Sequence, residues 1–173
     1  MKYSILKDLL LLKVKALYDI ESELIKALPK MAKNASHGEL KQAFQTHLDE
    51  TKVQKERLEK IFALLGEKPK KTKVEAIRGL VEDAKWLMDE DMSPQALDAS
   101  LIAAAQYVEH YEIAGYGTAR SWAEHIGLND VANLLEKNLK EEEQTDVILT
   151  SLAENALNEE ALLGQDSKDD GKK

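Results

Sequence analysis

The chain has 173 residues, 43% of them hydrophobic, with 24 basic against 32 acidic side chains and a formal net charge of −8. The excess of acid argues against nucleic acid and anionic membrane surfaces as partners, because binding to either depends on Lys and Arg. The chain has no cysteine, which excludes disulfides, thiolate metal sites and a cysteine nucleophile. Together with the absence of a signal-like or membrane-spanning apolar run, this predicts a cytoplasmic protein.

The first half of the chain predicts two long helices, because Ala, Leu, Glu and Lys are abundant while Gly and Pro are few. Apolar residues recur at helical spacing over residues 5–35, where Pro29 predicts a kink or local break. The same spacing runs over residues 36–65. Ser36 and Glu39 have the spacing of a capping box and predict the start of this second helix.

A connection of about 27 residues follows, long enough to cross a bundle of helices of this length. A second capping box at Thr72 and Glu75 predicts a shorter helix within this connection, ending near residue 89. Ser93 before Pro94 then predicts the capped start of the third long helix.

The third long helix is predicted over residues 94–127 and the fourth over residues 129–163. Short turns within each pair make its two helices antiparallel neighbours. The sequence therefore predicts an all-α protein, a ferritin-like antiparallel four-helix bundle whose long middle connection contains a short extra helix. This domain is expected to cover residues 1–163, followed by a disordered polar tail over residues 164–173.

Each long helix carries acidic side chains at mid-length on the face that its apolar residues turn toward the core. The inward acids predicted by this spacing are Glu21, Glu50, Glu109, Glu112, Asp146 and one of Glu142 and Glu143. Residues equidistant from the turn of an antiparallel hairpin lie opposite each other, and three acidic pairs meet this condition: Glu21 with Glu50, Glu112 with Glu143, and Glu109 with Asp146. With a rise of about 1.5 Å per residue, all three pairs fall near the middle of the bundle.

Ionised carboxylates buried without a counter-charge cost several kcal/mol each. No Lys or Arg occupies these central positions, so metal cations are the predicted counter-charge, with protons as the alternative. An oxygen-rich, histidine-poor ligand set favours iron or manganese, although Mg²⁺ and Ca²⁺ also suit oxygen ligands. His47 and Gln54 lie one turn to either side of Glu50, which makes them either further ligands or hydrogen-bonded core residues. A hydrated channel lined by the acids is the other reading.

Three segments, HLDETKVQ at residues 47–54, AAAQYVEHYEIAGYGT at 103–118 and EEQTD at 142–146, resemble the bacterial YciE/YciF family of ferritin-like stress proteins. The resemblance extends over nearly the whole chain up to the tail. It implies a ferritin-like bundle with a di-iron-type centre, two ions per chain, and a homodimer.

The pair Glu109 and Glu112 is also similar to a ligand pair of the rubrerythrins. That resemblance matches five glutamates of this chain to glutamate ligands: Glu21, Glu50, Glu109, Glu112 and Glu143. The two histidine ligands of rubrerythrins are replaced by Val53, which cannot bind a metal, and Asp146, which can. Peroxidase or ferroxidase activity is therefore not simply inherited.

Two functions stay open at this point. The chain is either a di-iron or di-manganese oxidoreductase that reacts with O₂ or peroxide, or a non-enzymatic, metal-stabilised helical stress protein that acts as a dimer.

Overall fold

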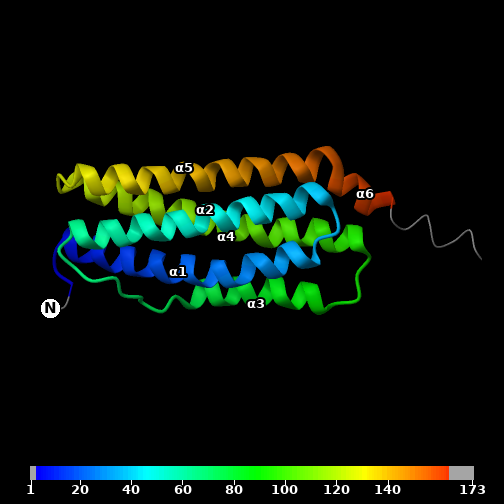
Figure 1. Ribbon diagram of the computed structural model, residues 1–173, viewed down its shortest axis with the longest axis horizontal. Helices are drawn as coiled ribbons and strands as arrows, with labels where there is room; N and C mark the ends of the chain where they lie inside the picture. Colours follow the sequence, from blue (N-terminus) through cyan, green and yellow to red (C-terminus); the bar gives the residue numbers. More distant parts are fainter. Residues whose placement is uncertain (1–2, 164–173) are drawn as a thin grey trace, which may run out of the picture.

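The computed structural model describes residues 3–163, and this part of the chain is helical, with no strand (Figure 1). The elements are α1 (Leu6–Asn34), α2 (Gly38–Leu64), α3 (Glu75–Asp89), α4 (Pro94–His125), α5 (Asn129–Leu152), a π-helical turn (Ala153–Leu157) and α6 (Asn158–Leu163). The prediction of an all-helical protein is confirmed. The predicted tail, residues 164–173, lies outside the described residues. Among the described helices, none has both the length and the apolar character that crossing a bilayer requires.

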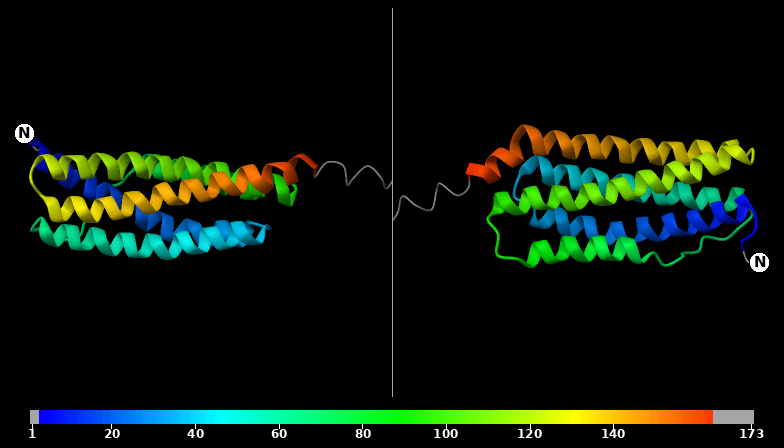
Figure 2. Two further views of the ribbon diagram at one scale, coloured as in Figure 1. Left: turned by 90° about the horizontal axis from the view of Figure 1, so that it is seen from above. Right: turned by 180° about the vertical axis from the view of Figure 1, so that it is seen from behind.

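The four long helices pack side by side, with α1 against α2 and α4, and α5 against α2 and α4. Figure 1 shows the turn between α1 and α2 at one end of the bundle and the turn between α4 and α5 at the other. The connection from α2 to α4 runs the length of the bundle, and its helix α3 packs on α1 and α4 (Figure 2). This crossing brings the middles of all four long helices to the same height.

Apolar residues at helical spacing form the core between the helices. In α1 these include Leu10, Val14 and Leu17, none of which is exposed to solvent. Pro29 does not break α1, which continues to Asn34. The predicted local break at Pro29 is therefore wrong, and the residues on both sides of it, Leu28 and Met31, are held in the core.

The start of α2 is capped from another helix. The capping box predicted at Ser36 is wrong, because α2 begins at Gly38 and no side chain of its own cap accepts a bond. The carboxylate of Asp98 on α4 instead accepts the N–H groups of Ser36 and His37, both at 2.8 Å, and also the Ser36 hydroxyl. Asp98 is thus a buried carboxylate whose hydrogen bonds join two helices.

The start of α3 repeats this arrangement with a carboxylate from α1. The box predicted at Thr72 is also wrong, since α3 begins at Glu75 without a side-chain cap of its own. Asp19 accepts the Val74 N–H at 3.0 Å and pairs with the Arg78 guanidinium at 2.7 Å.

The start of α4 agrees with the sequence. The hydroxyl of Ser93 accepts the Ala96 N–H at 3.2 Å, and Pro94 is the first helical residue.

Replacing Asp98 with Ala should lower the free energy of unfolding by about 2–4 kcal/mol, because two backbone N–H groups and a hydroxyl lose their acceptor. Urea denaturation measures the change. Asp83→Ala, which removes an exposed aspartate of α3, is the control and should change stability by less than about 0.5 kcal/mol. Equal stability of the two variants would contradict the capping role of Asp98.

Candidate metal centre

Four residues from three helices converge in the middle of the bundle: His47 from α2, Glu109 and Glu112 from α4, and Glu142 from α5. Each offers one ligand atom, and these four atoms all lie within 4.8 Å of one another. All four side chains are buried, with His47 the most exposed at 3%. We call this group the central cluster. Glu21 of α1, fully buried, lies close enough for its charge to act on Glu112.

The buried polar atoms of this region are largely unpaired. Among the described residues, nine such atoms have no hydrogen-bond partner: both carboxylate oxygens of Glu112 and of Glu142, one each of Glu21 and Glu109, Nε2 of His47, and both amide atoms of Gln54. His47 Nε2 lies 3.3 Å from a Glu109 oxygen and 4.0 Å from a Glu142 oxygen. Because buried polar groups are nearly always paired in native proteins, this concentration of unpaired polar atoms, most of them carboxylate oxygens, is typical of a binding site for a cation.

Burial controls the protonation of the central cluster. It raises the pKa of Glu109 and of Glu112 well above the ordinary range, and the charge of Glu142 adds to the effect in both. Burial raises the pKa of Glu142 to about 8. It lowers the pKa of His47 to about 4, which keeps the imidazole neutral and its lone pair available. Without a metal, the carboxyl groups therefore hold protons near neutral pH.

A hydrogen-bonded chain holds Glu21 in place. The Tyr116 hydroxyl donates to one Glu21 oxygen and accepts the Asn138 amide N–H at 3.0 Å. Asn138 in turn accepts from the Arg57 guanidinium at 3.0 Å, and Arg57 binds both oxygens of Glu141, at 2.5 and 2.8 Å. The second oxygen of Glu21 stays unpaired.

The inward acid of α5 is Glu142, whereas Glu143 is exposed to solvent. The preference for Glu143 at the site is therefore corrected in favour of its neighbour. Adjacent helical residues point about 100° apart, so only one of them can face the core. The buried side of α5 follows the spacing Leu135, Asn138, Glu142, Thr145 and Leu149.

Glu50 and Asp146 lie at the edge of the site and not among the four converging residues. Glu50 is partly buried and lines a cavity between α2 and α5. An Asp146 oxygen lies 3.4 Å from His110 Nε2 and 3.4 Å from Gln106 Nε2, and its side chain is 22% exposed. From α2 the structure instead brings in His47 and the buried Gln54, the two residues whose roles the sequence left open.

Two residues of the site were not predicted. Asn138 is fully buried, and its position four residues before Glu142 was a usable signal, because that spacing places both on one helical face. Arg57 lies at a partly exposed position on α2, and its long side chain extends to Asn138. No local sequence pattern predicts this contact.

The metal-free protein should lose stability as the pH rises from about 6.5 to about 8.5. Raised carboxyl pKa values contribute stability that is complete below about 4.3, the pKa of an unfolded Glu, and that disappears as the pH passes the native value, about 8 for Glu142. The lowered pKa of His47 changes the stability only below this pH range. Its contribution to the free energy of unfolding is lost as the pH falls below about 6.5.

Each carboxyl that stays protonated in the native state contributes roughly 1.4 kcal/mol per pH unit to this slope. Urea denaturation of the chelator-treated protein at several pH values measures it. Glu142→Gln should make the slope shallower by the contribution of one carboxyl, while its neighbour Glu143→Gln should leave it as in the wild type. A flat profile for the wild type would show that these carboxyls do not hold protons.

Comparison with known proteins assigns the chain to a family. Residues 5–162 match the family described as a domain of unknown function, DUF892. The chain is 43% identical over 145 residues to protein YciF of Escherichia coli (strain K12), covering 83% of this chain and 87% of that protein.

Solved structures agree with the sequence match. The crystal structure of the Escherichia coli stress protein YciF has a TM-score of 0.86 at 40% identity and covers 90% of this chain and 99% of that one. YcfI of Rhodopseudomonas palustris, whose description is that of a structural protein, has a TM-score of 0.84 at 41% identity, covering 86% of this chain and 94% of that one. The resemblance seen in the sequence is confirmed, and the chain belongs to the DUF892 family, with the stress protein YciF among its relatives.

Proposed function

We propose that this chain is a YciF-like stress protein with a ferritin-like bundle that binds two metal ions at the central cluster and Glu21. The nine unpaired buried polar atoms are the observation that carries this proposal. Charge supports the number of ions. Four buried carboxylates, those of Glu21, Glu109, Glu112 and Glu142, carry four negative charges when ionised, and two divalent cations balance them.

The donors present fit iron, with manganese as the second choice. Carboxylate oxygens and one neutral imidazole suit these borderline cations, whereas a site for zinc or copper would draw on thiolates or more imidazoles. The residues that would hold the ions are Glu21, His47, Glu109, Glu112 and Glu142. Gln54, with both amide atoms free, lies beside them as a further oxygen donor.

The favoured activity is a reaction with O₂ or peroxide. Iron, when bound, supplies the electrons that reduce the oxidant. The protein side chains exclude water from the centre, and Tyr116 with Asn138 fixes one oxygen of Glu21 while leaving the other free. A buried site of this kind keeps the reaction away from the solvent.

The second candidate is a non-enzymatic stress protein whose bundle is stabilised by the metal. The description of the relative YcfI as a structural protein favours it. In this second candidate the metal replaces protons as the counter-charge in the core. Its only role is then to stabilise the native state. A homodimer is part of both proposals, and it is tested by the mass of the protein in solution.

Metal content tests the centre. Protein loaded anaerobically with Fe²⁺ and freed of excess should hold about two ions per chain, and Glu112→Gln should lose at least one of them, because it removes an ionised carboxylate whose oxygens are both free. Elemental analysis gives the ratio. Glu143→Gln, an exposed neutral replacement, should keep the wild-type content, and a wild type without retained metal would refute the centre.

Turnover separates the two candidates. With excess ascorbate present as the electron donor that returns the iron to Fe²⁺, the iron-loaded protein should consume many equivalents of peroxide per chain if it is an oxidoreductase. If the metal is structural, peroxide consumption should not exceed that of ascorbate with the same concentration of free iron. Thermal unfolding with and without chelator completes the comparison. Free metal at about 100 times its dissociation constant should add about 2.7 kcal/mol of stability for each bound ion in either case.

A further inference from the structure

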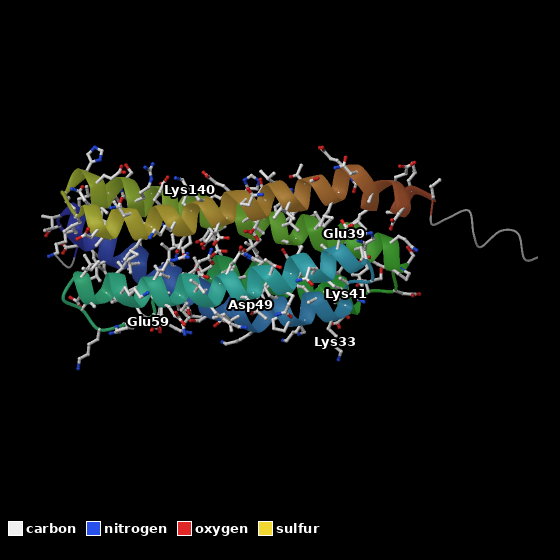
Figure 3. The ribbon with its side chains drawn as sticks, turned by 45° about the horizontal axis from the view of Figure 1, so that its top comes forward. Lys33, Glu39, Lys41, Asp49, Glu59 and Lys140 are labelled. Atoms are coloured by element: carbon white, nitrogen blue, oxygen red, sulfur yellow. The ribbon has the colours of Figure 1, made fainter. Side chains whose placement is uncertain are left out.

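A cavity of about 300 Å³ opens between the first half of α2 and the last part of α5, and it reaches the middle of the bundle at His47 and Glu50. Its lining carries two carboxylates, Glu39 and Glu50, and neutral polar side chains that include Gln42 and Gln144. Within the described helices, no Lys or Arg lines it. Figure 3 shows Glu39 near the start of α2, toward α5, and Lys41 on the outer side of the helix. The cavity is therefore negative in charge, with apolar walls from residues such as Ile148 that strengthen the field inside it.

His47 joins this cavity to the central cluster. It is one of the lining residues, although only 3% of it is exposed. Its Nδ1 lies 3.5 Å from the hydroxyl of Thr145, which also lines the cavity. Its Nε2 faces the opposite way, 3.3 Å from the Glu109 oxygen. One imidazole thus separates the cavity from the buried carboxylates.

The central cluster needs such an opening, since its members are almost completely buried and an ion cannot reach them through packed helices. We propose that the cavity between α2 and α5 is the entry route for divalent cations, with Glu39 and Glu50 attracting the ion at the mouth and His47 receiving it at the inner end. This inference rests on the proposed metal centre and assigns its path of loading. The alternative occupant is a neutral oxidant, which would gain nothing from the two carboxylates.

Blocking the cavity tests the route. Gln42→Trp and Gln144→Trp each place an indole at the lining, from α2 and α5 respectively, without changing charge. Gln45→Trp puts the same side chain on the exposed surface of α2, away from the cavity. Metal-free protein is mixed with Co²⁺, the reaction is stopped with excess EDTA after set times, and protein-bound cobalt is counted.

At least one of the two lining variants should load tenfold or more slowly, with Gln45→Trp at the wild-type rate and the same final cobalt content in all four proteins. If both lining variants load at the wild-type rate, or if Gln45→Trp slows loading equally, the route is wrong while the metal centre stands. A wild type that binds no cobalt overturns both.

Charge gives a second, independent arm. Glu39→Gln removes a carboxylate from the mouth, and Glu56→Gln removes an exposed one from the same helix outside the cavity. Glu39→Gln should slow Co²⁺ uptake severalfold in low salt, and the difference should shrink as salt screens the attraction. Equal rates for the two variants at low salt would count against attraction at the mouth. The same variants loaded with Fe²⁺ test the alternative occupant. If O₂ oxidises the bound Fe²⁺ more slowly in Gln42→Trp than in the wild type while cobalt uptake is unchanged, the cavity is an oxidant route and the proposal is overturned.

Discussion

Four carboxyl groups buried in one helical core, with no Lys or Arg among the converging residues that the structure describes, are the constraint on which the rest of the site depends. Their charge cannot stay unbalanced in such a place, because an isolated buried charge costs several kcal/mol. Protons balance it in the metal-free protein, and a pair of divalent cations would balance it in the loaded one. The neutral imidazole of His47 and the single bond from Tyr116 to Glu21 leave lone pairs free for the second state.

Buried carboxylates with a structural role are hydrogen-bonded in this protein. Asp98 accepts three hydrogen bonds at the start of α2, and Asp19 is paired with Arg78 and the start of α3. Glu112, equally buried, has both oxygens free. The contrast lies within one protein and one kind of group. It separates carboxylates that hold helices together from carboxylates kept available for a ligand.

Much of the fold and of the metal centre was predictable from the sequence, and the wrong predictions have physical causes. Helical spacing located the long helices and the buried Glu21, Glu109 and Glu112, because the periodicity of a long amphipathic helix is a strong signal. The capping boxes at Ser36 and Thr72 failed because Asp98 and Asp19 arrive from distant parts of the chain. The preference for Glu143 over Glu142 failed for another reason, since spacing along a helix tolerates an error of one residue while side-chain direction does not.

The central claim is that metal replaces protons on the buried carboxylates, and the protons released on binding measure this most directly. Metal-free protein is titrated with Mn²⁺ in weakly buffered solution at pH 7, and the base needed to hold the pH constant is recorded. Saturation should release about two to four protons per chain, because the raised carboxyl pKa values leave these groups protonated before metal enters. Binding of Mn²⁺ without proton release, or no binding at all, would contradict the claim.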